Sequence, residues 1–292
     1  MTNKLGVHAL LFTDSWTDAS AKMAIDKAVR IGFDVIEVLI FDPATVDGKM
    51  TRRIAADAGI GVVLGMALGP ETDISSLDQA ISRRGEDMIE CCLAIAEDAG
   101  ATAVSGITYA AFNRYNAPPT KAHRAQVVEA LGRLAGKASA CGMRIGLEPV
   151  NRYESYLVNT LDAAGSIVRE IGSKSLFVHM DTFHMNIEES DIAGAIARNA
   201  GLLGYAHVAE NHRGVLGAGT FDFKAYFRAL ALAGYTGGIT VESFSSAALG
   251  PAIVGAVGLW RQPWTNMDEA ARNALAFIRA QIAAAKAGNV VW

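Results

Sequence analysis

Four polar side chains with the chemistry of metal ligands each follow a short apolar segment of the sequence. Glu148 ends the run MRIGL, Asp181 ends LFVHM, His207 ends LLGYA and Glu242 ends GGITV. Successive members of this set are 33, 26 and 35 residues apart, which is the length of one strand–helix unit. If each run is a strand of one parallel sheet, the four side chains meet at one edge of that sheet.

Three carboxylates and one imidazole form an oxygen-rich donor set. Such a set suits hard divalent cations, whereas a structural zinc site prefers Cys and His in a closed tetrahedron. The cysteines of the chain also lack the spacing of a zinc motif. We therefore predict that the four residues hold one divalent cation per subunit, Mn²⁺ in first place and Co²⁺ or Mg²⁺ as substitutes.

The elements that must position these residues are visible as an alternation of two patterns. Short apolar or β-branched runs alternate with longer segments in which apolar residues recur at helical spacing. Several runs are almost wholly apolar, which is typical of strands buried on both faces of a parallel sheet. No G-x-G-x-x-G motif follows the first run, which disfavours an open dinucleotide-binding sheet. The runs begin near Leu5, Phe33, Ile60, Thr102, Met143, Leu176, Leu203 and Gly238.

Eight such units predict an α/β fold, a single (β/α)8 TIM barrel that forms one domain over residues 1–292. A helix over about residues 267–286 is expected to close the barrel. Active sites of such barrels lie at the C-terminal ends of the strands. The four predicted ligands stand at those ends.

Composition narrows the classes of partner. The chain is 51% apolar and carries 26 basic and 30 acidic residues, a net charge of −4, so no nucleic-acid partner is expected. Its longest uncharged stretch, Phe244 to Trp260, has 17 residues and contains Pro251, which is too short and too broken for a membrane span. The few cysteines and the missing signal-peptide pattern predict a cytoplasmic protein.

A second group of polar residues follows the same strands. Glu154 and His184 come shortly after the fifth and sixth runs, and Arg213 comes after the seventh. All three are placed to reach over the metal and bind substrate hydroxyls.

Five further residues are weaker candidates for the site. His8 lies in the first apolar run, as a substrate contact or an interior histidine, and His179 shares the face of the sixth run with a ligand two residues on. Glu37 stands in an apolar run, where an unpaired carboxylate would be costly, so we expect a barrel partner or contact with the site. Among the aromatic loop residues, Trp16 and Tyr109 are predicted to form an apolar wall for the substrate.

The segments LEPVNRYESYLVNT, VHMDTFHMNIEE, HVAENHRG and TVESF resemble the ketose 3-epimerases. These are the D-tagatose, D-psicose (allulose) and L-ribulose 3-epimerases, within the xylose-isomerase-like barrel superfamily. The resemblance runs from the GVH segment of the first run to the eighth run. It departs at three places: Tyr205-Ala206-His207 stands where the family often has His-Phe-His, Leu216 where it often has Pro, and His8 where tagatose-type members have Phe.

The resemblance implies a metal-dependent isomerase that epimerises free ketoses at C3, with L-ribulose, D-tagatose and D-fructose or D-psicose as substrates. By it, Glu148 and Glu242 are metal ligands that double as the acid/base pair. Glu154, His184 and Arg213 hold the O1 to O3 end of the sugar. A homo-oligomer, dimer or tetramer, is also implied.

Epimerisation next to a ketone requires a proton to leave C3 and return on the opposite face. A base on each face and a cation that stabilises the cis-enediolate meet this need. The same ligands would also serve an aldose–ketose or hydroxypyruvate-type isomerase, or an inosose dehydratase. A DNA-repair endonuclease on this barrel is disfavoured by the acidic charge, and two carboxylates beside a metal disfavour a non-catalytic sugar-binding protein. Residues 245–258 are either a cover of the site or a subunit contact.

Overall fold

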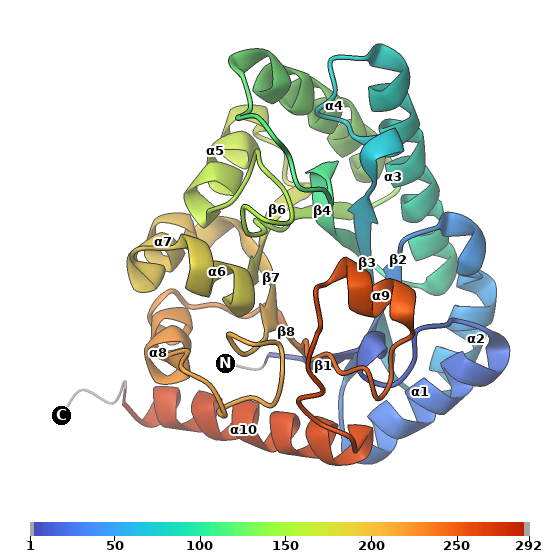
Figure 1. Cartoon of the computed structure of the whole chain (residues 1–292), viewed down its shortest axis with the longest axis vertical. Coiled ribbons are helices and arrows are strands. Elements are labelled where there is room, and N and C mark those ends of the chain that lie inside the picture. The colour runs from blue at the N-terminus through green and yellow to red at the C-terminus, as the bar shows by residue number, and fades with distance from the viewer. Residues whose placement is uncertain (1–2, 289–292) are drawn as a thin grey trace.

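The computed structural model describes residues 3–288, in which eight parallel strands close into a barrel (Figure 1). Each strand pairs with its neighbours in chain order, and β8 returns to pair with β1. The predicted (β/α)8 barrel is thereby confirmed. The strands are β1 (Leu5–His8), β2 (Val35–Ile40), β3 (Gly61–Leu68), β4 (Ala103–Ala111), β5 (Arg144–Leu147), β6 (Leu176–Asp181), β7 (Leu203–Val208) and β8 (Gly238–Val241).

Helices form a ring around the barrel (Figure 1). The last of them, α10, lies on the outside between α8 and α1, where it packs against both. The domain limits predicted at residues 1 and 292 lie outside the described residues. The helices are α1 (Asp18–Ile31), α2 (Gly48–Ala58), α3 (Gln79–Ala99), α4 (Lys121–Ala140), α5 (Leu161–Ile171), α6 (Thr182–Glu188), α7 (Ile192–Asn199), α8 (Phe223–Leu232), α9 (Pro251–Ala256) and α10 (Met267–Ala287).

Local sequence signals set where these helices begin and end. The side chain of Thr17 caps the first turn of α1, and Gly32 ends that helix in the left-handed conformation at φ 104°. Asp47 and Gly59 do the same for α2. Within the described part of the chain, none of the helices is both long and apolar enough to cross a bilayer.

One strand is longer than its apolar run predicts. The pairing of β3 with β4 shifts between Ala67 and Leu68, from Ile107 to Ala111, so β4 continues past the point expected for its end. Tyr109 therefore lies within β4 and not in a loop after it. A register irregularity of this kind changes which residues face the mouth of a barrel.

The short helix α9 lies at the mouth of the barrel, near the ends of β1 and β2. Ile253 of α9 and the following Val257 contribute to hollows that are also lined by Leu10 and Leu39. The residues 245–258 thus stand beside the strand ends.

Candidate active site

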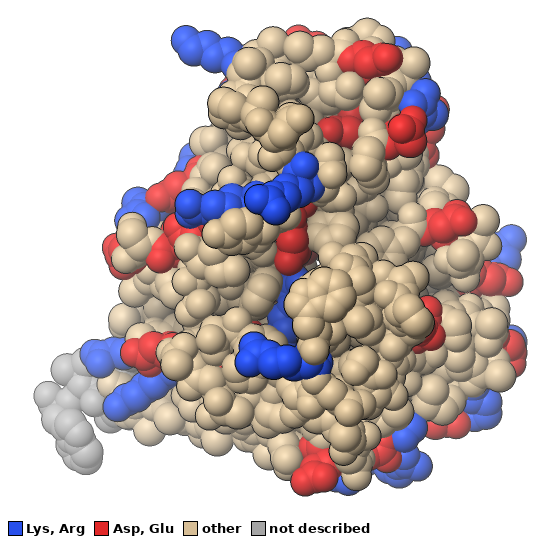
Figure 2. All heavy atoms as spheres, viewed as in Figure 1, with Lys and Arg blue, Asp and Glu red and all other residues tan. Residues whose placement is uncertain are grey.

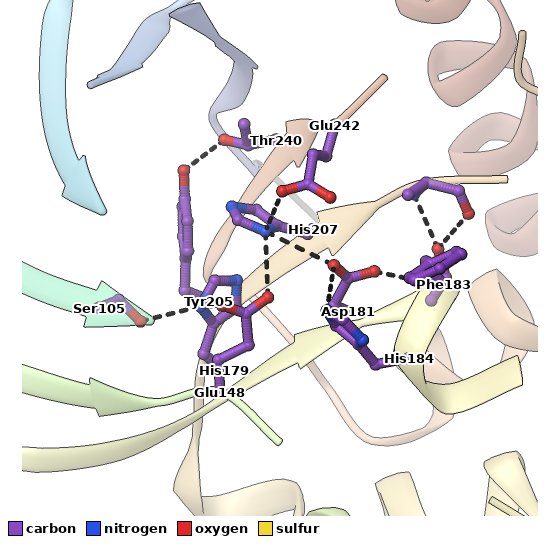
Figure 3. A network of polar contacts seen from close by, with 12 residues as sticks. Ser105, Glu148, His179, Asp181, Phe183, His184, Tyr205, His207, Thr240 and Glu242 are labelled. Atoms are coloured by element: carbon purple, nitrogen blue, oxygen red, sulfur yellow. Dashed lines mark hydrogen bonds and ion pairs between the residues drawn. The ribbon is translucent and has the colours of Figure 1, made fainter. Parts of the chain in front are cut away.

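The four predicted ligands converge on one imidazole nitrogen (Figure 3). His207 Nδ1 lies 3.4 Å from Glu148 Oε1, 3.5 Å from Glu242 Oε1 and 3.8 Å from Asp181 Oδ2. All four side chains are buried at the C-terminal ends of β5 to β8. The sequence spacing therefore predicted a cluster that the structure brings together.

Several atoms of this cluster are left without a partner. Among the described residues, His207 Nδ1, Asp181 Oδ2 and Glu242 Oε2 are buried and accept or donate no hydrogen bond. Buried polar atoms are costly in that condition, and three carboxylates around one point repel one another. A divalent cation at this point would satisfy the orphaned atoms and the excess negative charge. The donor set therefore fits a cation of the Mn²⁺, Mg²⁺ or Co²⁺ type.

A carboxylate on the opposite side of the barrel orients the imidazole. Glu37 of β2 lies 2.7 Å from His207 Nε2, and the hydroxyl of Tyr205 donates to the same oxygen at 2.7 Å. A carboxylate only accepts, so Nε2 carries the proton and Nδ1 turns to the cluster. Glu37 thus has the expected barrel partners and also lines the pocket above the cluster.

His179 stands beside the four predicted ligands and forms, with Glu148 and His207, a further group that could hold a cation. Its Nδ1 lies 2.9 Å from Ser105 Oγ and 3.8 Å from Glu148 Oε2, and its ring meets that of His207 edge to face (Figure 3). Burial lowers the pKa of His179 to about 4, so the ring is neutral near pH 7. His179 packs against both Glu148 and His207.

The charges of the cluster perturb one another strongly. Burial and the neighbouring charge of Asp181 raise the pKa of Glu242 to about 8. Burial disfavours a charged His207, but Glu37, Asp181 and Glu148 together outweigh that effect and raise the pKa of the imidazole well above its usual value. For Asp181 burial is outweighed by the charges of His184 and His207, and its pKa is lowered. Opposed shifts of this kind are typical of catalytic and metal-binding sites.

The second predicted group forms a pair above the cluster. Both terminal nitrogens of Arg213 donate to the carboxylate of Glu154, at 3.0 and 3.3 Å, and Arg213 Nε lies 3.7 Å from Glu242 Oε2. The guanidinium stacks on the ring of Phe183, 4.0 Å from its centroid. Arg213 adopts a left-handed backbone at φ 55°, which turns its side chain inward.

His184 points one defined nitrogen at the same space. The backbone N–H of Asn151 donates to His184 Nδ1 at 3.1 Å, and the amide of Asn151 lies 2.9 Å from it. His184 Nε2 lies 3.3 Å from Arg213 Nη2, 3.7 Å from Asp181 Oδ2 and 4.0 Å from Glu154 Oε2. Asn151 thus holds one edge of the ring, and the other edge faces Arg213, Asp181 and Glu154.

The cluster forms the floor of an open pocket with a cavity volume of about 70 Å³. Its remaining walls are largely apolar and come from β1 to β4 and from the segment after β8. His8 of β1 also lines the pocket, and its Nδ1 accepts a hydrogen bond from the N–H of Leu10 at 3.1 Å. The apolar side chains of the pocket are Leu10, Leu39, Phe41, Met66, Ala67, Ile107, Phe112, Val150, Phe244 and Val257.

The two predicted aromatic residues do not line this pocket. Tyr109 is fully buried, and its hydroxyl donates to the carbonyl of Val158 at 2.8 Å. Trp16 lines a neighbouring hollow, and its indole N–H donates to Thr51 Oγ1 at 2.8 Å. The direct contact with substrate predicted for Tyr109 has no support in this geometry, because the ring faces the interior between β4 and the β5 loop.

Two residues with structural roles at the site escaped the sequence reasoning. Asn151 fixes the His184 ring, and Glu210 accepts the backbone N–H groups of Asn211, Gly217 and Phe221, at 2.9 to 3.2 Å, which shapes the loop that carries Arg213. Both are polar residues within a few positions of a strand end, and this was the only signal that pointed to them.

Comparisons with known proteins agree with this architecture. The sequence model of the xylose isomerase-like TIM barrel family matches residues 25–281. The ketose 3-epimerase of Arthrobacter globiformis is 36% identical over 97% of this chain and 98% of its own, and the L-ribulose 3-epimerase of Mesorhizobium japonicum is 38% identical over 94% and 93%. The structure of the D-allulose 3-epimerase of Methylomonas sp. in complex with D-allulose superposes with a TM-score of 0.93 at 35% identity, covering 96% of this chain and 97% of the other. The chain therefore belongs to the xylose isomerase-like TIM barrel family, and it is an enzyme of the ketose 3-epimerase group within that family.

Proposed function

We propose that this enzyme uses a divalent cation to epimerise free ketoses at C3, with L-ribulose, D-tagatose and D-fructose or D-psicose as substrates. The observation that carries the proposal is the pair Glu148 and Glu242. They come from β5 and β8, with the ligands of β6 and β7 between them, and each directs one oxygen at His207 Nδ1. Two carboxylates at one metal point provide the two bases that a change of configuration requires.

In this mechanism one glutamate takes the proton from C3 and the other returns a proton to the opposite face. The roles are reversed for the opposite epimer. Arg213, Glu154 and His184 bind the hydroxyl and carbonyl oxygens at the C1 to C3 end, which keeps C3 between the two carboxylates. Glu148, Asp181, His207 and Glu242 would hold the cation, and a cation there would supply stabilisation of the negative charge of the deprotonated ketose.

We propose Mn²⁺ as the cation, because one imidazole among three carboxylates is a hard donor set with one borderline nitrogen. Co²⁺ and Mg²⁺ are the substitutes. Metal analysis of the purified protein and titration of the metal-free form with each cation test this order. A site that prefers Zn²⁺ in tetrahedral geometry would contradict it.

The reaction is tested by a chromatographic assay with L-ribulose, D-fructose and D-tagatose in ²H₂O. The expected products are C3-epimeric ketoses that carry deuterium at C3. Aldoses in their place would instead show proton transfer between C1 and C2, the isomerase reaction. Glu97→Gln, which changes an exposed carboxylate on α3, is the matched control for Glu→Gln variants of the site and should leave turnover unchanged.

We further propose a cytoplasmic homo-oligomer that acts on a small-molecule sugar. Free Cys91, Cys92 and Cys141 suit a reducing compartment. Light scattering of the purified protein gives the oligomeric state, and a mass of about 31 kDa would contradict an oligomer.

A further inference from the structure

A second hollow adjoins the metal pocket at the mouth of the barrel. This side hollow, of about 520 Å³, is lined by the segment after β1, the segment after β2 and α9. Leu10, Leu39 and Phe41 line both it and the metal pocket, so these three side chains form a border that the two spaces share. A cavity of several hundred Å³ is in the range that binds small molecules.

Hydrogen bonds hold two of the three walls of the side hollow in place. The N–H of Gly250, at the start of α9, donates to Asp14 Oδ2 at 2.6 Å and ties α9 to the segment after β1. The indole of Trp16 donates to Thr51 of α2, which anchors the same segment to the second unit. The hollow is therefore a built feature and not a gap between loose loops.

The order of strands in the barrel sets the direction of a bound ketose. Glu154, His184 and Arg213 hold its reacting end and follow β5, β6 and β7. The side hollow is lined by the segments that follow β1 and β2. These two strands stand across the closed barrel from β5 and β6 (Figure 1). A ketose whose C1 to C3 atoms are held over the metal cluster consequently extends its distal carbons toward Leu10, Leu39 and Phe41, the side chains that border the side hollow.

The chemistry of the lining selects the kind of group that fits. Within the described residues the lining contains no Lys, Arg or His, and it carries two carboxylates, Asp14 and Asp42. The surface over α9 is also uncharged (Figure 2). Such walls disfavour a phosphate. The indole of Trp16 and the ring of Phe41 offer apolar surface, and carboxylates at the edge accept hydroxyl protons, which together suit a sugar ring.

We propose that the side hollow is a subsite for a neutral second sugar ring, linked to the distal end of the ketose. This deepens the function proposed above and rests on it. The enzyme then takes ketose disaccharides whose C1 to C3 end is free, as well as monosaccharides. The chemistry at C3 is unchanged, since one proton leaves C3 and one returns.

The test compares three sugars that share one reacting end. These are D-fructose, 6-O-α-D-glucosyl-D-fructose, which adds a neutral ring at O6, and D-fructose 6-phosphate, which adds a dianion there. With Mn²⁺-loaded enzyme we expect kcat/KM for the disaccharide to be at least equal to that for D-fructose. We expect kcat/KM for D-fructose 6-phosphate to be lower than that for D-fructose by about tenfold or more. A disaccharide that is not turned over while D-fructose is would overturn the proposal.

Variants that fill the side hollow distinguish an effect on the subsite from an effect on the reaction itself. Thr45→Trp and Ile253→Trp add bulk from two different walls, and we expect each to lower the ratio of kcat/KM for the disaccharide to that for D-fructose by about tenfold. Ala44→Trp is the matched control, because Ala44 is exposed next to Thr45 but does not line the hollow. Equal losses for both sugars in both filled variants would contradict a separate subsite.

Equilibrium binding distinguishes failure of the subsite from failure of the proposed reaction. Calorimetry on Mn²⁺-loaded enzyme should give a Kd for the disaccharide several-fold below that for D-fructose, and Thr45→Trp should remove the difference. If none of the sugars is epimerised but this binding pattern holds, the subsite stands and the reaction is wrong. Equal Kd values for the two sugars would overturn the subsite whatever the turnover.

Discussion

The two halves of the barrel mouth are built from different kinds of side chain. The half from β5 to β8 carries the ligand cluster and the ion pair of Arg213 with the half-buried Glu154, all held within a few ångströms of one another. The half from β1 to β4 presents mainly apolar side chains to the same pocket, such as Leu39, Met66 and Ile107. The half from β5 to β8 is suited to proton transfer, and the half from β1 to β4 is suited to the selection of the substrate.

The difference follows from what each task costs. Charges removed from water are stable only with partners close by, so the residues of the first half must be assembled together. Apolar contacts need no such partners and depend on shape alone. Glu37 is the exception that joins the halves, since it crosses from β2 to bind His207 of β7.

The largest effect is expected from removing either base. Glu148→Gln and Glu242→Gln should each lower kcat for epimerisation by about a thousandfold, because general acid–base catalysis contributes factors of this order. Each variant should still exchange the C3 proton of one epimer with ²H₂O, through the glutamate that remains. If a variant exchanged the C3 proton of both epimers at equal rates, the hypothesis that each glutamate serves one face of the sugar would be contradicted.

Cation binding should depend steeply on pH. In the cation-free protein Glu242, with its pKa of about 8, and His207, with a raised pKa, both carry protons at pH 7. Both protons must leave when the cation binds, so affinity falls as pH falls, by about tenfold per proton and pH unit, or about a hundredfold between pH 7 and pH 6. Calorimetry in buffers of different ionisation enthalpy counts the protons. Release of none at pH 7 would show that the two groups are already deprotonated.

Glu37→Gln tests the link between the halves. The amide oxygen still accepts the proton of His207 Nε2, but the negative charge is lost, and we expect cation affinity to fall by about tenfold to a hundredfold. The variant should also release one proton fewer at pH 7, since the pKa of His207 is no longer raised by Glu37. Tyr205→Phe removes only one hydrogen bond to Glu37, so it should lower the cation affinity by less than Glu37→Gln does. An unchanged affinity in Glu37→Gln would make Glu37 a packing residue.

The smallest effect on the reaction should come from the apolar half. Ile107→Ala and Met66→Ala should leave Mn²⁺ affinity unchanged and alter the ratio of kcat/KM for L-ribulose to that for D-fructose by no more than about tenfold. One or two methylenes in an apolar pocket discriminate by this amount. Competition assays with both sugars in one mixture give the ratio directly. A thousandfold loss on both sugars would break the division between the halves.

The sequence predicted the charged half better than the apolar half. Glu148, Asp181, His207 and Glu242 were identifiable because each ends a recognisable strand, and parallel strands place their ends together. Glu154, His184 and Arg213 follow those ends closely enough to reach the same space.

The apolar wall was harder to predict because its residues carry no distinctive chemistry. Phe112 and Met66 look like any core residue in the sequence, and only the register of β3 and β4 turns them to the pocket. Tyr109 was misplaced because the shift between Ala67 and Leu68 cannot be read from an apolar run. Trp16 is next to the metal pocket and not in it, because a hydrogen bond to α2 holds the indole aside.

Asp181 serves two parts of the molecule at once. Its Oδ1 accepts the N–H of Phe183 at 2.7 Å and caps the first turn of α6, while its Oδ2 faces the ligand cluster. His184 stands in that same turn. A cation that draws on Oδ2 would hold the carboxylate still and thereby restrain the start of α6, so amide hydrogens there should exchange more slowly in the loaded enzyme. Arrival of the metal would in this way prepare the residue that receives the sugar, before any sugar is present.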